Sequence, residues 1–345
     1  MRHEWIDAIK GYGIILVVAG HTKFFFAFPT MLLYLTAGYM AMFFIASGYT
    51  TKKEPLREAI IKKAYRLLIP YTFYGISIAL FNPLLRHLQN SSVDNNGQWL
   101  GLLYSRFSLY PLGTDDNYFL LSDFLSPLWF LTAMFVAFTG FYIYAKLRTT
   151  TKKAICSGLF FIATIAMSQF KILLPWSIDT ALLCAIFIIT GYELQRVFIK
   201  KDVVYNGKVI AALFALFATY LLITKTNGLP NLSVRIYGNH PYISIFLYYI
   251  LSVLATILIS YIFIAIRNTF MVKILSFVGK HSLRIMCIHM PIVWLSINYI
   301  QGNNPYMHII QFLVAFSCTL IISILLEYFY NSISSKYNYN IVKYL

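Results

Sequence analysis

Charged side chains are scarce in this sequence. Asp, Glu, Lys and Arg together make up 12% of its 345 residues, about half the share found in a typical soluble domain. Apolar residues account for 59%, and many stand in long runs with no polar positions between them. These features exclude a soluble globular fold. We therefore expect an all-α, polytopic bundle of membrane-spanning helices.

Cysteine is also rare, and its positions are isolated from one another. The four cysteines lie in separate apolar runs, at Cys156, Cys184, Cys287 and Cys318. None of them has a second Cys or a His at the spacing of a metal site. We expect these side chains to pack as small hydrophobic groups, and we expect neither a disulfide framework nor a bound metal.

Acidic residues are fewer than basic ones, and the basic residues are divided unequally between the two predicted sides of the membrane. The chain carries 28 Lys and Arg against 12 Asp and Glu. We expect ten spans of about 18–23 residues each. They lie near residues 8–28, 33–50, 67–84, 126–146, 153–171, 177–197, 208–224, 243–265, 282–300 and 308–330. If the N-terminus is cytoplasmic, twenty Lys and Arg fall in cytoplasmic segments and six in segments on the other side.

This asymmetry follows the positive-inside rule. It predicts that both termini are cytoplasmic, and it accounts for the basic charge without a nucleic-acid partner. We expect a single membrane domain over residues 1–345, with a long extracytoplasmic loop at about 85–125 and no separate soluble domain. A basic segment at 55–66 is expected to form a helix at the cytoplasmic surface that continues into the third span.

Two ionisable residues flank the first apolar run. Lys10 and His21 are eleven positions apart, which is close to three full turns of a helix, so their side chains project from one face at an axial separation of about 16 Å. If Lys10 lies at the inner boundary, His21 lies within the hydrocarbon. An ionisable group at that depth is a functional-site candidate, and histidine can act as a general base near neutral pH.

The surrounding residues carry a resemblance to a known family. The segment WIDAIKGYGIILVVAGHT places Asp7, Lys10, Gly11 and His21 in the order and spacing of the first span of the acyltransferase family 3 proteins, which are integral-membrane O-acyltransferases. The Lys at the basic position, where most members have Arg, resembles the fucose-acetylase-like subgroup. Four later segments are also similar to family motifs: FFIASGYT with Ser47, KKAYRLLIPY with Lys63 and Arg66, PLWFLTAMF with Trp129, and GKHSLRIMCIHMPI with Ser282 and His289.

This resemblance implies an acyl-CoA-dependent O-acetyltransferase of the bacterial cytoplasmic (inner) membrane that uses no metal. Acetyl-CoA is the expected donor, and its phosphates would bind Lys10, Lys63 and Arg66. The expected acceptor is a surface polysaccharide (O-antigen, capsule or exopolysaccharide) or its polyprenol-linked precursor. The expected catalytic residues are His21, as a base or a transient acyl carrier, and Asp7, which would orient or pair with a basic group. The residues expected to line the cavity are His289, Ser47, Trp129 and Ser282.

A transporter or flippase of a lipid-linked saccharide is the alternative, since ten spans with buried histidines would also suit it. Many transporters contain internal repeats, and no such symmetry is visible in this sequence, which favours the enzyme. The acceptor sugar, the acyl chain length, the side on which transfer is completed and the oligomeric state all stay open at this point.

Overall fold

The protein is helical throughout the part of the chain that the computed structural model describes, which comprises residues 3–28, 38–87, 96–106, 108–110, 125–200, 207–228, 230–302 and 304–337. The helices are α1 (Glu4–His21), α2 (Phe24–Ala27), α4 (Tyr39–Tyr49), α5 (Leu56–His87), α6 (Asn96–Tyr104), α7 (Trp129–Lys146), α8 (Thr150–Ser168), α9 (Ile178–Lys200), α10 (Gly207–Asn227), α11 (Pro241–Ala265), α12 (Phe270–Lys280), α13 (Ser282–Tyr299) and α14 (Pro305–Tyr337). Three short 3-10 helices are η1 (Ser126–Leu128), η2 (Pro175–Ser177) and η3 (Leu232–Val234). The all-α prediction is confirmed.

Each of the ten segments that we expected to cross the membrane contains a helix in its described part. Among the described helices, six are long and apolar enough to do so, at Leu56–Pro83, Trp129–Lys146, Thr150–Ser168, Pro175–Arg196, Tyr242–Ala265 and Pro305–Ser332. The chain is therefore a multi-pass membrane protein, while ten crossings and the orientation stay predictions. The basic segment after Pro55 does continue into the apolar part of α5 as one helix. Most of the predicted outer loop, at 88–95, 107 and 111–124, lies outside the described residues.

Two details differ from the prediction. The first expected span is interrupted, because α1 ends at His21 and the short helix α2 begins only at Phe24. His21 therefore stands at a helix end, not inside a continuous helix. The second difference is α12, which we did not predict because its 11 residues are too few to span a membrane.

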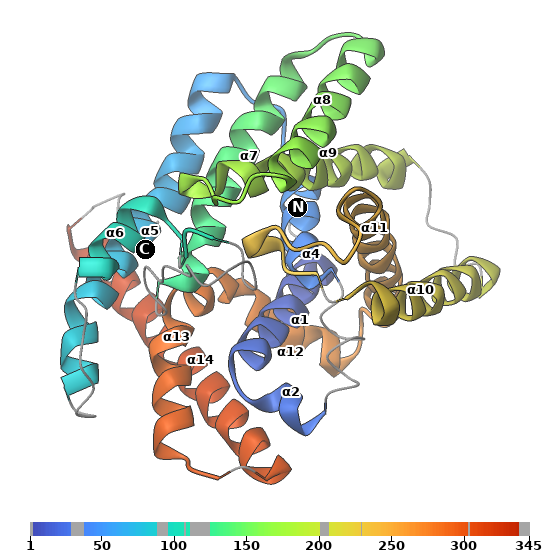
Figure 1. The fold of residues 1–345 in the computed structure, drawn as a ribbon. Coiled ribbons are helices and arrows are strands. Elements are labelled where there is room, and N and C mark those ends of the chain that lie inside the picture. The colour runs from blue at the N-terminus through green and yellow to red at the C-terminus, as the bar shows by residue number, and fades with distance from the viewer. Residues whose placement is uncertain are drawn as a thin grey trace.

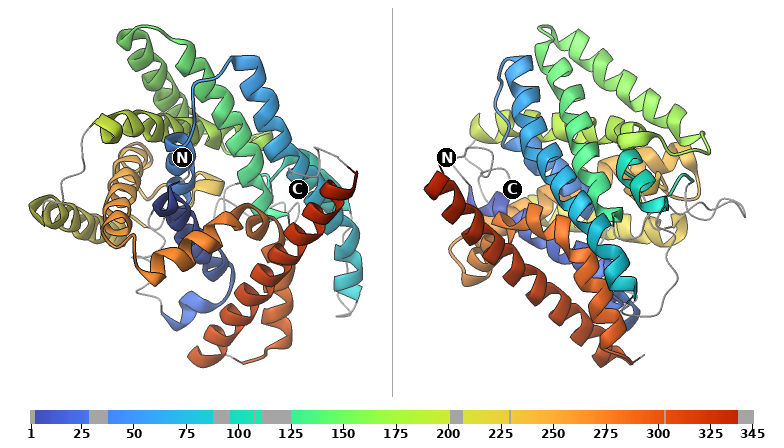
Figure 2. Two further views of the ribbon diagram at one scale, coloured as in Figure 1. Left: turned by 180° about the vertical axis from the view of Figure 1, so that it is seen from behind. Right: turned by 90° about the vertical axis from the view of Figure 1, so that its left-hand side faces the viewer.

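Helix α1 lies at the centre of the molecule, with α4, α11, α12 and α13 around it (Figure 1). By contrast, α14 runs along the outside in both views of Figure 2. Burial agrees with this arrangement, because 72% of the residues in the apolar window of α9 are buried, against 22% for α14 and 6% for α8. Helices α8 and α14 therefore present most of their apolar surface to lipid.

Glycines allow the central helices to approach closely. A Cβ atom at Gly11 of α1 would overlap the Leu275 carbonyl of α12, and one at Gly279 of α12 would overlap the Asp7 carbonyl of α1. Gly48 of α4 and Gly191 of α9 make a second reciprocal pair of the same kind. Small residues at helix contacts are the usual means of tight packing in membranes. The first pair holds the N-terminal half of α1 against the end of α12.

Candidate functional site: two cavities along α1

Two cavities that contain ionisable side chains border α1, one near each of its ends, and a smaller, mainly apolar cavity lies beside Trp5, Ile6 and Ile9 of the same helix. We call the cavity that contains Lys10 the basic cavity, and it has a volume of about 340 Å³. Its lining is contributed by α1, α4, α5, α7, α12 and α13. The residues are Asp7, Lys10, Phe43, Ser47, Thr50, Lys63, Arg66, Leu67, Phe130, Met134, Phe138, Gly279, Lys280, Ser282, Leu283 and Met286.

Positive charge dominates the basic cavity. Four of its lining residues are cationic, namely Lys10, Lys63, Arg66 and Lys280, while Asp7 is acidic. They come from three helices, since Lys63 and Arg66 share one face of α5, Lys10 lies on α1 and Lys280 ends α12. The Lys63 ammonium lies 3.4 Å from the centre of the Phe138 ring, a cation–π contact that holds it in place.

Ser282, the first residue of α13, also lines the basic cavity. Helix α12 ends at Lys280, with a single residue between it and the start of α13, so the negative end of α12 and the positive end of α13 lie side by side and offset each other. The four cations therefore determine the charge of the cavity, and they suit a phosphate-bearing molecule that carries several negative charges.

The second cavity contains His21, and we call it the histidine cavity. Its volume is about 440 Å³. Its lining comes from α1, α4, η1, α7, the segment 230–236, α11 and α13. The residues are Val17, Gly20, His21, Tyr39, Met40, Pro127, Trp129, Pro230, Asn231, Leu232, Ser233, Ile236, Tyr248 and Met286. Apart from His21, none of these lining residues is ionisable near neutral pH.

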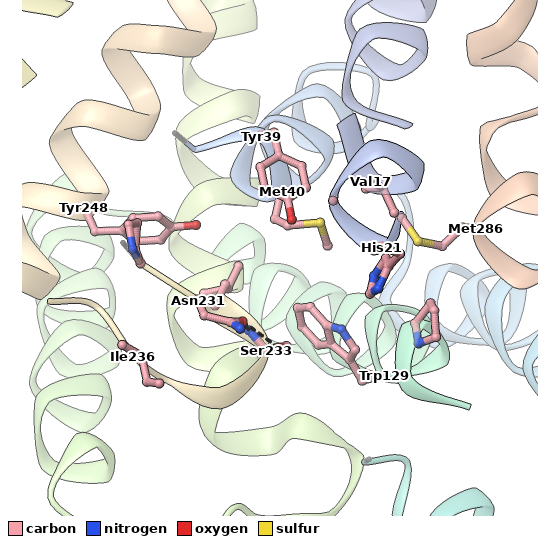
Figure 3. A pocket seen from close by; sticks show the side chains of 14 residues that line it. Val17, His21, Tyr39, Met40, Trp129, Asn231, Ser233, Ile236, Tyr248 and Met286 are labelled. Carbon is pink, nitrogen blue, oxygen red and sulfur yellow. Dashed lines mark hydrogen bonds between the residues drawn. The ribbon is translucent and has the colours of Figure 1, made fainter. Parts of the chain in front are cut away.

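Figure 3 shows how the polar groups of the histidine cavity are arranged. The His21 side chain points into the cavity on the side that also holds Trp129 and Met286, and Tyr248 and Ile236 lie on the opposite side. His21 is exposed to this internal space. Hydroxyl, amide and aromatic groups beside a histidine suit a neutral polyhydroxyl compound, because aromatic faces pack against apolar ring surfaces and amides bind hydroxyls.

His289 lies behind His21. Its imidazole is fully buried, its ring centre is 5.2 Å from that of His21, and it is absent from the lining of both cavities. We predicted His289 as a cavity-lining residue, but the structure places it in a layer behind the cavity wall. The reason is its position on α13, which directs its ring toward the end of α1.

Hydrogen bonding fixes the tautomer of His289. Its Nδ1 atom lies 3.0 Å from the carbonyl oxygens of both Ile285 and Met286. Because carbonyl oxygens only accept hydrogen bonds, Nδ1 must carry the proton. The Nε2 atom is then an acceptor, and it has no hydrogen-bond partner among the residues that the structure describes. An unsatisfied buried acceptor beside His21 is unusual and calls for a functional explanation.

A buried ionic network supports one wall of the histidine cavity. Asp179 binds two arginines, Arg106 and, at 3.0 Å, Arg235. Arg106 also donates to the carbonyl of Ser233, a lining residue. Burial lowers the pKa of the Arg106 guanidinium, and the Asp179 carboxylate opposes that shift. Arg235 adopts a left-handed backbone conformation, with φ of 58°. The two arginines therefore fix the segment 231–236 in place.

Most of the residues predicted from the sequence do line the cavities. Asp7, Lys10, Ser47, Lys63, Arg66 and Ser282 line the basic cavity, and His21 and Trp129 line the histidine cavity. Asp7 and His21 are fourteen positions apart on the same helix, a separation of about 21 Å. Asp7 therefore accompanies the cations of the basic cavity and does not contact His21.

The sequence did not reveal several lining residues. Lys280 was not among the predicted site residues, although it adjoins Gly279 in the family-like segment GKHSLRIMCIHMPI. Tyr39, Asn231, Ser233 and Tyr248 carry no local signal, since isolated polar or aromatic residues near membrane boundaries are common. Met286 was also missed. As for metals, no group of His, Cys, Asp and Glu with the geometry of a metal site occurs in the described part of the chain.

The fold and cavities thus define a multi-pass membrane protein with a cationic pocket and a histidine pocket along one helix. Residues 3–328 match the model of the acyltransferase domain of acyltransferase family 3. The chain belongs to this family and is an acyltransferase. The transporter alternative receives no support. No curated protein and no solved structure gives a significant match to the chain.

Proposed function

We propose that this acyltransferase moves an acetyl group from acetyl-CoA to a hydroxyl of a cell-surface polysaccharide (O-antigen, capsule or exopolysaccharide) or of its polyprenol-linked precursor. We place it in the bacterial cytoplasmic (inner) membrane, and in the fucose-acetylase-like subgroup because of Lys10. The observation that carries the proposal is the arrangement of the cavities. A basic cavity and a histidine cavity both border α1, and both are lined by Met286.

The basic cavity is the proposed donor site. Coenzyme A carries a diphosphate and a further phosphate, and Arg66 can bind such groups through two parallel hydrogen bonds. Lys10, Lys63 and Lys280 supply compact positive charges beside it. Acyl-CoA is available in the cytoplasm, and the positive-inside rule predicts that this end of α1 faces that side. The predicted orientation and the predicted donor are therefore mutually consistent.

The histidine cavity is the proposed acceptor site and the place of transfer. The hydroxyl oxygen of the sugar attacks the thioester carbon while His21 takes the hydroxyl proton. The carbon–sulfur bond then breaks, and the coenzyme A thiolate leaves and recovers the proton. In the alternative route, His21 first carries the acyl group itself. In both routes positive charge develops on the imidazole, and the negative end of the α1 dipole stabilises it.

His289 acts as a positioning residue in this scheme. Its Nε2 atom can only accept a hydrogen bond, since the proton is held on Nδ1 by two carbonyl oxygens. If the facing nitrogen of His21 donates to it, the other nitrogen of His21 is left with its lone pair toward the cavity. That tautomer is the one a base or acyl carrier requires.

The direct test is NMR of the surface polysaccharide from cells with and without the gene. We expect O-acetyl signals with the wild-type gene. We expect none without the gene or with His21→Ala, provided that immunoblotting shows equal amounts of both proteins in the membrane. An unchanged spectrum in all three strains would contradict the acceptor class. O-acetylation that persists in His21→Ala would contradict the assignment of His21.

A further inference from the structure

Met286 stands between the two cavities. It lines the basic cavity and the histidine cavity, and among the described lining residues it is the one common to both. Only 2% of its surface is exposed, so its side chain fills the space where the cavities approach each other. Any group that passes from the basic cavity to His21 at this point must displace it.

The other residues at this boundary are less able to move. Phe130 packs against Phe43 and Phe44, with ring centres 5.6 and 5.0 Å apart, and against Trp129 at 6.2 Å. Phe43, Phe130 and Trp129 are all buried. Interlocked aromatic rings of this kind cannot turn without disturbing their neighbours. This aromatic cluster therefore forms the rigid part of the wall.

Methionine differs from these aromatic residues in flexibility. Its unbranched thioether chain has three rotatable bonds and adapts to irregular space. The backbone of Met286 is fixed, however, because its carbonyl oxygen accepts the hydrogen bond from His289 Nδ1 at 3.0 Å. The side chain thus swings from an anchored point that adjoins the His21–His289 pair.

We propose that Met286 determines acyl-chain specificity, because its side chain is the movable part of the wall and admits only a short acyl group to His21. This inference rests on the proposed function, since it takes the basic cavity as the donor site. A two-carbon acyl group needs a small displacement of the thioether, whereas each further methylene must enter the space that the Met286 side chain occupies.

The test compares three substitutions on α13, using membranes that contain the full-length protein. Met286→Ala removes the thioether and widens the passage, Met286→Phe narrows it with a rigid ring, and Met290→Ala is the control. Met290 lies one turn further along the same helix and lines neither cavity. Donor binding is measured with labelled coenzyme A, and transfer is measured with acetyl-, butyryl- and hexanoyl-CoA on the same membranes.

We expect Met286→Ala to raise the ratio of butyryl to acetyl transfer by about tenfold or more, since one methylene in a closed pocket changes rates by about 10- to 200-fold. Met286→Phe should reduce acetyl transfer by about tenfold or more, with coenzyme A binding unchanged. Met290→Ala should behave as the wild type in both assays.

Two results would overturn the inference. If Met286→Ala binds coenzyme A and keeps the chain-length preference of the wild type, Met286 does not set that preference. If the wild type itself neither binds coenzyme A nor transfers any acyl group from it, the donor assignment fails, and the inference fails with it. Coenzyme A binding by the wild type therefore separates the two failures.

Discussion

Adjacent cations on α5 have different surroundings, and this difference separates cations that line the basic cavity from cations on the surface. Lys62 forms an exposed ion pair with Glu54 at 2.9 Å, and such pairs contribute about 0–1 kcal/mol. Lys63, the next residue, is half-buried over Phe138 and lines the basic cavity. Two neighbouring residues of one helix thus place one positive charge in solvent and the other beside the basic cavity.

Arg66→Ala is predicted to raise the KM for acyl-CoA by about 10- to 100-fold, because a hydrogen bond to a charged group contributes about 1.5–3 kcal/mol. Arg66→Lys should have an intermediate effect, since it keeps the charge but loses the paired geometry. Lys62→Ala is the control and should leave the KM unchanged. Steady-state kinetics over a range of donor concentrations measure all three. Equal KM values for Arg66→Ala and Lys62→Ala would contradict the proposal that the basic cavity binds the donor.

The second residue-scale prediction concerns His289. His289→Leu should lower kcat by about 10- to 100-fold, because it removes the acceptor to which His21 would donate in the proposed scheme. The KM for the donor should not change, since His289 lines neither cavity. His289→Gln can return an acceptor to the position of Nε2 and should recover part of kcat. A purely structural role would predict no recovery, and kcat and membrane abundance would fall together.

Among the helices, the packing of α1 against α12 holds the basic cavity in shape. Gly11 and Gly279 occupy reciprocal positions, each facing a carbonyl of the other helix. Gly279 also lines the cavity, beside Lys280. Separation of these helices would move Lys10 and Lys280 apart, so stability and donor binding should change together.

Gly279→Ala is therefore predicted to lower the thermal stability of the detergent-solubilised protein and to weaken donor binding. Its Cβ would overlap the Asp7 carbonyl, and overpacking of this kind costs about 1–3 kcal/mol or more. The matched control is Gly158→Ala in α8, where a Cβ would meet nothing within 4 Å. That change should be neutral or stabilising by about 0.5–1 kcal/mol. Equal melting temperatures for the two variants would contradict the close approach.

Regular helices explain why part of this site could be predicted from the sequence. The helical period alone places Lys10 and His21 on one face of α1, and it places Lys63 and Arg66 together on α5. The segment 231–236 offers no such period. Its position depends on ion pairs and hydrogen bonds with Arg106 and Asp179, which are distant in the sequence. Helix α12 was missed for a different reason, since it packs along α1 without the length of a span.

On the scale of the whole molecule, the distribution of charge predicts the orientation of the cavities. Arg148 precedes α8 and Lys171 follows it, so the two positions should lie on opposite sides of the membrane. By the positive-inside rule, Arg148 should be cytoplasmic and Lys171 external. The basic cavity would then open toward the cytoplasm and the histidine cavity toward the outside.

This orientation is tested with single cysteines introduced at the two positions, in a chain whose four native cysteines are replaced by serine. A membrane-impermeant maleimide should label Lys171→Cys on intact cells. It should label Arg148→Cys only after the cells are permeabilised. The reverse pattern would mean that the protein has the opposite orientation, with the basic cavity on the side of the membrane away from the cytoplasmic acyl-CoA.

The central claim is that the basic cavity binds the donor and that transfer takes place in the histidine cavity. It is tested most directly by measuring coenzyme A binding and acetyl transfer on the same membranes. His21→Ala should bind coenzyme A as the wild type does, and it should lose transfer by about 10²- to 10⁴-fold, the usual contribution of a general base. The double variant Lys63→Ala with Arg66→Ala should lose binding itself. Transfer at a wild-type rate by His21→Ala, or undiminished coenzyme A binding by the double variant, would contradict the account.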